Sequence, residues 1–412
     1  MPASLNNPIS RKSKRESLML NNLKVLDLSR VLAGPWTSQS LADLGADVIK
    51  IERPGVGDDT RAWGPPYFES ANGDLTSAYF MSANRGKRSA AINIATPQGQ
   101  ALVQKLAQQS DIVIENYKAG DLARRGLDYP TLSKTNPGLI YCSITGFGQS
   151  GPNREKPGYD FIIQAMGGLM SITGAEGSEP QKVGVALADI LTGLYSTIAI
   201  LAALNRRNET GEGEHIDMAL FDTQLATLAN QASNFLVSGQ APRQLGNAHP
   251  NIVPYQSFST ADERIAIAVG NDNQFKTLCR VLGNEHLASE RRFATNSERV
   301  AHHEELVNLL QDLFAVRGAT AWIELLEADG VPCGRINTIE QAFSEPQSIE
   351  RELVREIDGM PLVANPIRFM KNPITYDRAP PHLGQHTNDI LETELGLTNE
   401  EITALHANNI VG

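Results

Sequence analysis

Basic side chains follow several strand-like segments in the first 130 residues. The set consists of Arg30, Lys50, Arg53, Arg85, Lys87, Arg88, Lys118, Arg124 and Arg125. Ligands of open α/β sheets bind at the carboxyl ends of the strands, and cations placed there suit phosphate groups. Single surface lysines and arginines are usually only solvated. Because these residues recur at successive strand ends in an acidic protein, the sequence favours a ligand that carries phosphates.

A second chemical feature is Asp189, at the start of the apolar segment 188–204. A carboxylate near a helix N-terminus is stabilised by the helix dipole and by free backbone N–H groups. From the residues alone, Asp189 is therefore interpreted as a helix cap. The alternative is a nucleophile, because small and apolar neighbours would partly desolvate the carboxylate and make it more reactive.

Other site chemistries lack their motifs. Residues 146–151 match G-x-G-x-x-G, but the following PNREKPG cannot begin the helix that receives a pyrophosphate, so NAD is not expected. The eight histidines contain no H-E-x-x-H pair, no G-x-S-x-G occurs, and the three cysteines are far apart. We therefore expect no metal ion.

Strand-like and helix-like segments alternate from residue 23 onward, which predicts an α/β fold with a mainly parallel sheet. The expected strands are residues 23–29, 47–52, 89–94, 111–117 and 139–147. Helices are expected over 37–46, after the start signal Thr96-Pro97, and over 220–237. The segment 188–204 is apolar nearly all round, which predicts a buried helix that is too short and interrupted to cross a membrane.

The length and charge of the chain bound its organisation and its partners. A chain of 412 residues exceeds the roughly 150 of one domain, so its length suits either two domains or one large composite domain. We expect a large domain over 21–222, a small domain over 240–330, a return to the large domain over 331–412, and a flexible tail over 1–20. With 36 basic and 47 acidic residues the net charge is −11, so neither a nucleic acid nor a membrane is expected as a partner.

A series of motifs runs in order from about residue 23 to 222. They are LKVLDLSRVLAGP, LGADVIKIERPGVGDDTR, NRGKRSAAINI, ENYKAGDLARRGL, LIYCSITGFGQSGP, GYDFIIQAMGGLM, VALADILTGLY and TGEGEHIDMALFD. LGNAHPNIVPYQSF, GVPCGRI and PPHLGQHT extend the series almost to the end. The chain thereby resembles CoA-transferase family III, which includes formyl-CoA transferase, carnitine CoA-transferase and α-methylacyl-CoA racemase. The resemblance implies a Rossmann-like large domain, a smaller α/β domain and an interlocked homodimer.

The resemblance also assigns roles to residues. It implies that Asp189 is the family's catalytic aspartate, which attacks the donor thioester and then carries an aspartyl-CoA thioester. Coenzyme A is then a substrate, and neither a metal ion nor NAD is required. The positions that match the family's CoA contacts are Val31, Leu32, Ala33, Arg53, Ile92, Ile94, Asn116, Tyr117, Lys118, Arg124 and Tyr159.

Two positions depart from named relatives. Leu32 stands where formyl-CoA transferase carries a glutamine, so an oxalate-specific formyl transferase is not expected. Tyr159 stands where the racemases use a histidine, and a tyrosine of pKa about 10 is a poor proton shuttle at neutral pH. The motifs VLAGP, GNAHPNIVPYQ and GQHT look most like the branch that moves CoA from succinyl-CoA to dicarboxylic acids such as glutarate or hydroxymethylglutarate.

The distal carboxylate of such an acid needs a cation or a donor. The candidates are Arg61, Arg85 and His249, although the arginines are equally well interpreted as surface residues and His249-Pro250 as a turn. The loop 246–249 is expected to close over Asp189 and exclude water. A racemase of the same fold and a non-catalytic acyl-CoA binding protein remain as alternatives.

Cysteine usage and the N-terminus bear on the compartment. Three scattered cysteines favour a reducing compartment, which we take to be the cytoplasm. The first twenty residues are basic before Glu16, so the mitochondrial matrix is the alternative if they form a transit peptide.

Overall fold

The structure, a computed structural model, describes residues 18–412 and divides into two compact units. The large unit is built from Met1–Gly168, Val183–Ala232 and Gln347–Gly412. The small unit is built from Leu169–Lys182 and Ser233–Pro346. The chain therefore leaves the large unit and returns to it. The expected tail or transit peptide falls mostly on residues 1–17, outside the described residues.

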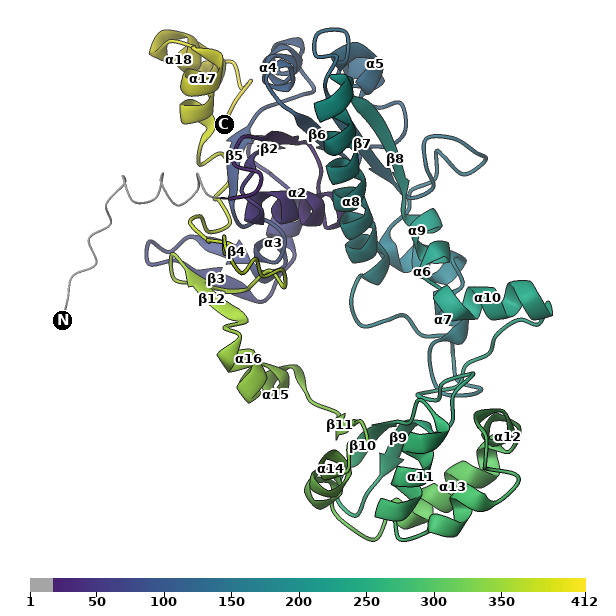
Figure 1. Cartoon of the computed structure of the whole chain (residues 1–412). Helices are drawn as coiled ribbons and strands as arrows, with labels where there is room; N and C mark the ends of the chain where they lie inside the picture. Colours follow the sequence, from purple (N-terminus) through teal and green to yellow (C-terminus); the bar gives the residue numbers. More distant parts are fainter. Residues whose placement is uncertain (1–17) are drawn as a thin grey trace, which may run out of the picture. The chain divides into compact units, whose positions relative to one another are not determined.

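A six-stranded parallel sheet forms the centre of the large unit, in the order β5-β2-β1-β6-β7-β8 (Figure 1). Its strands are β1 (Lys24–Asp27), β2 (Asp47–Glu52), β5 (Lys87–Ala91), β6 (Ile112–Glu115), β7 (Ile140–Thr145) and β8 (Glu214–Ala219). The predicted α/β fold with a mainly parallel sheet is confirmed. β2 has the predicted bounds, and β8 adds a strand that the sequence did not predict.

Helices cover both faces of this sheet (Figure 1). They include α2 (Ala33–Asp43), α4 (Pro97–Gln108), α5 (Tyr129–Leu132), α8 (Leu187–Thr210), α17 (Thr387–Leu395) and α18 (Asn399–Ala407). One core joins α4, α17 and α18 to residues such as Leu26 and Val113, and the other joins α2 and α8 to Val25 and Ile114. Burial on both faces explains why the central strands are apolar at consecutive positions.

Shorter elements complete the large unit. They are η1 (Asp59–Ala62), β3 (Tyr67–Glu69), β4 (Leu75–Ser77), α3 (Ala78–Met81), η2 (Ala123–Arg125), α6 (Asp160–Met166), α9 (Leu220–Ala226), β12 (Val354–Ile357) and β13 (Met360–Val363). β3 pairs with β4, and β12 pairs with β13, each pair antiparallel. A small apolar core joins Met81 and Phe68 to Met360 and Leu362, so the C-terminal segment packs on the segment around β3.

Two helix predictions can be compared directly with the structure. Thr96 caps α4, because its hydroxyl accepts the N–H of Gly99 at 3.1 Å while Pro97 occupies the first turn. The single helix expected over 220–237 is instead α9 followed by α10 (Ala229–Ser238). Ala229 has φ 48°, which a continuous right-handed helix cannot contain.

The helix α8 is longer and more exposed than predicted. Its 24 residues have a mean hydropathy of 1.8 in the most apolar window, so by length and composition it could cross a membrane, contrary to the prediction. Core helices share these properties, and α8 packs on α2, β7 and β8. Only 39% of that window is buried, because Leu194, Tyr195 and Ile198 face outward. The prediction of a helix buried all round is therefore wrong.

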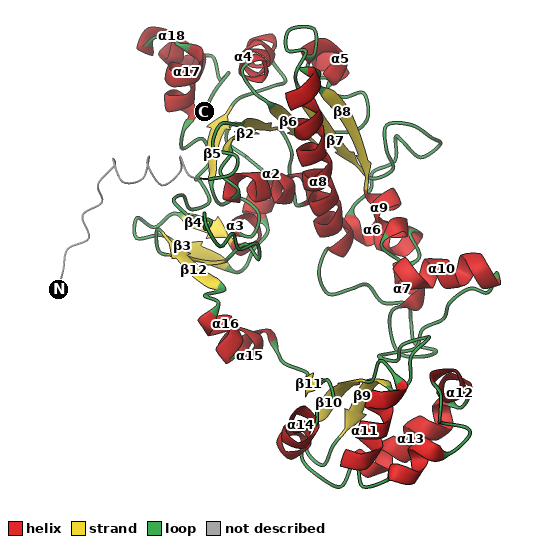
Figure 2. Ribbon diagram, in the orientation of Figure 1, coloured by secondary structure: helices red, strands yellow, loops and turns green. Residues whose placement is uncertain are grey.

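The small unit is a three-stranded antiparallel sheet with helices, shown in Figure 2. Its strands are β9 (Tyr255–Ser259), β10 (Arg264–Ala268) and β11 (Cys333–Arg335). Its helical elements include α7 (Leu169–Ile172), α11 (Asp272–Val281), η3 (Glu285–Ser289), α12 (Asn296–Ala301), α13 (His303–Phe314), α14 (Ala319–Ala328) and α15 (Ile339–Ser344), and α16 (Pro346–Glu350) follows. Phe258, Phe275 and Trp322 belong to its core. Arg299 is fully buried and donates to two backbone carbonyls and to Asp272.

Candidate active site

Two pockets lie at the carboxyl edge of the parallel sheet in the large unit. The first, of about 380 Å³, is lined by residues that follow β1, β2, β5 and β6. The second, of about 270 Å³, is lined by the start of α2, by residues after β6 and β7, and by Asp189. Arg30, Asp59 and Tyr117 line both pockets, so the two adjoin and form one elongated site.

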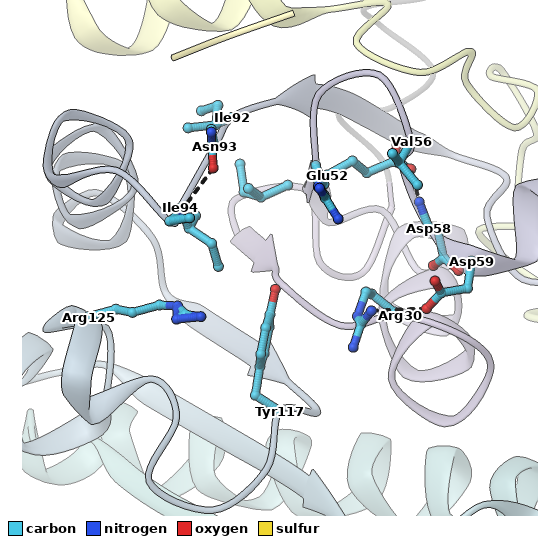
Figure 3. A pocket seen from close by; sticks show the side chains of 14 residues that line it. Arg30, Glu52, Val56, Asp58, Asp59, Ile92, Asn93, Ile94, Tyr117 and Arg125 are labelled. Atoms are coloured by element: carbon cyan, nitrogen blue, oxygen red, sulfur yellow. Dashed lines mark hydrogen bonds and ion pairs between the residues drawn. The ribbon is translucent and has the colours of Figure 1, made fainter. Parts of the chain in front are cut away.

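The first pocket combines cations with aromatic and aliphatic surfaces (Figure 3). Tyr117 and the guanidinium group of Arg125 point into it, opposite Ile94. Arg30 donates to Asp59 at 2.9 Å, and its guanidinium carbon lies 5.5 Å from the centre of the Tyr117 ring. Such a pocket can bind phosphate groups through the arginines and a flat ring against the apolar surface.

The structure brings together most of the residues predicted to contact CoA. Arg53, Ile92, Ile94 and Tyr117 line the first pocket. Val31, Leu32, Ala33, Asn116, Tyr117, Lys118 and Tyr159 line the second pocket. Arg124 lines neither pocket; it is exposed and paired with Asp121, whereas its neighbour Arg125 lines the first pocket. The contacts of these residues with CoA remain predictions.

The cluster Arg85 to Arg88 does not lie where the sequence suggests. β5 begins at Lys87, so Arg85 precedes the strand, Lys87 and Arg88 are its first residues, and all three lie away from its carboxyl end. Arg88 is bound by Asp47 and Glu394, and neither pocket includes it. The interpretation of this cluster as cations that follow a strand is therefore wrong, because a charged residue can begin a buried strand when carboxylates pair with it.

Arg61 and Arg85, the candidates for the distal carboxylate, are both engaged in ion pairs. Arg61 donates to both carboxylate oxygens of Glu52, at 2.8 and 2.7 Å. Arg85 donates to Asp43 at 2.8 Å and to the carbonyl of Val363 at 2.9 Å. Neither arginine lines the two pockets, so a substrate carboxylate would have to displace an internal partner. Their role in substrate binding remains a prediction.

His249 belongs to the small unit. Its backbone N–H donates to Tyr255, its Nδ1 accepts the N–H of Asn251 at 3.0 Å, and its ring centre lies 5.3 Å from that of Tyr255. Gly246 has φ 57° and donates to the carbonyl of Gly174, so a glycine suits this turn. These contacts agree with an ordered turn; the closure of this loop over Asp189 remains a prediction.

Asp189 lies in the first turn of α8, and only 9% of the residue is exposed. Burial and, to a smaller extent, the charge of Asp160 together raise the pKa of its carboxyl group from 3.8 to about 7. A carboxylate of higher pKa is more basic and a stronger nucleophile than one in water. Asp189 faces the second pocket, where a bound thioester would meet it.

Asp160, and not Asp189, caps α8. One carboxylate oxygen of Asp160 accepts the N–H groups of Ala188 and Asp189, at 2.8 and 3.4 Å, and the other accepts the side-chain amide of Gln164 at 2.7 Å. No side chain of the N-cap residue, Ala186, contributes to the cap. The capping interpretation of Asp189 is therefore wrong, and its carboxylate is left for the pocket.

The sequence analysis did not single out Tyr79, which lines neither pocket but is influenced by the charge of Asp189, or two cations of the second pocket. Tyr79 has its pKa raised to about 12 by burial and by the charges of Asp189, Asp160 and Asp58, so its phenol stays protonated. The Trp63 ring packs against Tyr79, with ring centres 5.1 Å apart. Both lie in a stretch whose sequence looks like a long polar loop. Two further cations line the second pocket, Arg154 and Lys156, and the glycine-rich loop that carries them gave the only sequence signal.

Other reactive groups lie elsewhere. Cys142, Cys279 and Cys333 are free, and burial raises the pKa of Cys142 and of Cys279 to about 12. No cysteine lines the two pockets. Within residues 18–412, no three His, Cys, Asp or Glu side chains are grouped to hold a metal ion. Asp189 is a buried carboxylate that lines the second pocket, and its role as the nucleophile remains a prediction.

A parallel α/β unit whose sheet edge carries cation-lined pockets beside a buried carboxylate is suited to a ligand that bears phosphate groups. The family model described as "CoA-transferase family III" matches residues 20–387. The chain therefore belongs to CoA-transferase family III, as the motifs predicted, and it is a CoA-transferase.

Named relatives and a solved structure agree with this assignment. The chain is 50% identical over 378 residues to "Succinate--glutarate CoA-transferase" of Agrobacterium fabrum, covering 90% of this chain and 94% of that one. It is 42% identical to human "Succinyl-CoA:glutarate CoA-transferase", covering 95% and 90%. A crystal structure of a CAIB/BAIF family protein from Brucella suis superposes with a TM-score of 0.82 at 50% identity, covering 92% of this chain and 99% of that one.

Proposed function

We propose that this enzyme moves CoA from succinyl-CoA to a free dicarboxylic acid, with glutarate as the first acceptor to test. The observation that carries the proposal is Asp189, a buried carboxylate of raised pKa that lines the second of the two adjoining pockets. The named activity of the two relatives supports the choice of donor and acceptor.

In the proposed reaction, the Asp189 carboxylate attacks the thioester carbonyl of succinyl-CoA, and CoA leaves as a thiolate. The thiolate then attacks the aspartyl carbonyl of the mixed anhydride, which releases succinate and leaves an aspartyl-CoA thioester. The acceptor carboxylate attacks this thioester, and the returning thiolate attacks the acceptor side of the new anhydride. Acyl-CoA is released and the Asp189 carboxylate is restored. Anhydride, thioester and acid interconvert without a metal ion.

The residues around Asp189 suit these steps. Burial favours the neutral acyl forms of the aspartate over the free carboxylate, because each acylation removes a buried charge. The raised pKa of Tyr79 keeps its phenol protonated at neutral pH, and we propose that this phenol donates a hydrogen bond to the oxyanion that develops at the attacked carbonyl. Arg30, Arg53 and Arg125 are the proposed contacts of the CoA phosphates.

The test is an incubation with succinyl-CoA and a pool of free mono- and dicarboxylic acids, followed by mass spectrometry of every new CoA thioester. Asp189→Ala is run alongside, with Asp222→Ala as the control, because Asp222 is an exposed aspartate in the first turn of α9. New thioesters that disappear in the Asp189 variant alone support the proposal. Deuterium uptake at the α-carbon of a 2-methylacyl-CoA, without transfer, would instead identify a racemase, and CoA binding without either reaction a binding protein.

We also propose a homodimer, which the resemblance implies. The exposed apolar residues Phe161, Ile162, Leu194, Tyr195 and Ile198 lie on α6 and α8, and a surface of this kind on one unit is typical of an association face. The large unit is assembled from the N-terminal and C-terminal parts of the chain, with the small unit between them in sequence, which is compatible with an interlocked dimer. Sedimentation at micromolar concentration tests the proposal, and a monomeric mass would contradict it.

The compartment is proposed from the cysteines. Three free cysteines suit a reducing compartment, either the cytoplasm or, with an import signal in the first twenty residues, the mitochondrial matrix. Imaging of the full chain and of a chain that lacks residues 1–17, each fused to a fluorescent protein at its C-terminus, distinguishes the two.

A further inference from the structure

The turn between β1 and α2 has an unusual backbone. Val31 has φ 71°, in the left-handed region that a β-branched residue rarely adopts. The next residue, Leu32, is the N-cap of α2 and supplies no side-chain cap. Val31, Leu32 and Ala33 all line the pocket that contains Asp189. A strained backbone at a ligand pocket persists only when the surrounding structure holds it, so the contacts of this turn are informative.

A buried ion pair holds one side of the turn. The Asp58 carboxylate accepts the N–H of Val31, at 3.2 and 3.3 Å to its two oxygens, and the N–H of Thr60 at 3.0 Å. The Lys50 ammonium lies 2.9 Å from Asp58 and donates to the carbonyl of Ser29 at 2.7 Å. Both charged side chains are 0% exposed. Lys50 therefore links the residue before the turn to the carboxylate that fixes Val31.

The other side of the turn is held by Asn116. Its amide oxygen accepts the N–H of Arg30 at 2.9 Å, and its amide nitrogen donates to the carbonyl of Arg30 at 2.6 Å. Asn116 and Asp58 each line one of the two pockets, but Lys50 lines neither. Of Lys50, Asp58 and Asn116, only Lys50 lines neither pocket, so Lys50 can influence a bound ligand only by fixing the conformation of the turn.

We propose that the buried Lys50–Asp58 pair is a positioning element for the CoA thioester, because it fixes the strained turn at residues 29–32. Arg30 of this turn lines both pockets, and Val31 and Leu32 line the second. Lys50 itself is a positioning residue and does not touch the ligand. This inference rests on the proposed use of the pockets for acyl-CoA. The physical reason is that Val31 left unrestrained would relax to a negative φ, which would rotate the peptide groups that face the ligand.

The test is the dissociation constant of free CoA, measured by titration calorimetry on folded protein. We expect Lys50→Met to raise this constant by about tenfold or more, since small displacements of a positioning group are costly. The control is Arg88→Met, which breaks a buried ion pair of the same unit at the start of β5 and away from the pockets. Arg88→Met should lower the melting temperature while leaving the constant within about twofold, as expected for a purely structural pair.

A second variant separates positioning from general damage. Glycine adopts a positive φ without strain, so in a Val31→Gly background the effect of Lys50→Met on CoA binding should shrink. If Lys50→Met does not fold, Asp58→Asn takes its place, because it keeps an oxygen for the N–H of Val31 but weakens the pair. An equal effect in both backgrounds, or an unchanged constant, overturns the inference alone. A wild-type protein that binds no CoA would overturn both the inference and the proposed function.

Discussion

Asp189→Asn should make the protein more stable as well as inactive. In the folded protein, burial holds the pKa of the Asp189 carboxyl at about 7, against an ordinary value of 3.8. The folded state therefore binds a proton that the unfolded state releases, and it loses stability as the pH rises from about 4 to 7. The difference between the two pKa values corresponds to about 4 kcal/mol at pH 8. An amide of the same shape avoids this cost.

The assay is scanning calorimetry of the wild-type and Asp189→Asn proteins between pH 4 and pH 8. The variant should gain little at pH 4, and its advantage should grow to about 4 kcal/mol at pH 8, or roughly 5 °C in melting temperature for a unit of this size. Asp222→Asn is the matched control, because Asp222 is an exposed aspartate in the first turn of α9. A variant that is no more stable than wild type at pH 8, or equally stabilised at every pH, would refute the reasoning.

Three further changes have defined outcomes. Asp160→Asn removes a negative charge that helps to raise the pKa of Asp189, so the acid limb of the plot of kcat/KM against pH should move to lower pH. An acid limb at the same pH would show that burial alone raises the pKa of Asp189. Gly193→Ala places a methyl group 2.8 Å from the carbonyl oxygen of Ala33, between α2 and α8, so it should lower the free energy of unfolding by about 1–3 kcal/mol and also lower kcat. Thermal unfolding and initial rates measure the two effects, and a variant with unchanged stability and kcat would mean that the helices separate freely. Arg299→Met leaves Asp272 and two buried carbonyls without their donor; it should destabilise the small unit by about 3–5 kcal/mol, seen as faster proteolysis after residue 232, and unchanged proteolysis would contradict this.

The parallel sheet was predictable because its strands are buried on both faces and therefore read as short apolar runs. β2 and β7 have nearly the predicted bounds for this reason. β5 begins at Lys87, before the predicted start at residue 89. The charges of Lys87 and Arg88 are unfavourable in a buried strand unless they are paired, and their partners Asp27 and Asp47 are distant in sequence. Such partners cannot be read from a single segment.

The site was predictable in part, and for a different reason. The motifs identified Asp189, but no local signal distinguished a nucleophile from a cap, because both are aspartates at a helix start. The distinction depends on Asp160, which precedes Asp189 by 29 residues and takes over the capping role only in the folded chain. Tyr79 was missed for the same reason, since its raised pKa results first from burial and then from the charges of residues that the fold brings near it.

The helix α8 joins the chemistry of this enzyme to its expected assembly. Its buried face carries Asp189 and Gly193, which let it approach the start of α2, where the turn at Val31 forms the pocket wall. The opposite face exposes Leu194 and Ile198, and exposed apolar side chains gathered on one helix face suit the proposed partner surface. A subunit that covers this face would restrain the helix that bears the nucleophile, because a displacement of α8 moves Asp189 relative to α2. In the proposed dimer, association and catalysis would therefore depend on the same helix, and a variant that weakens the dimer should lose turnover as well as mass.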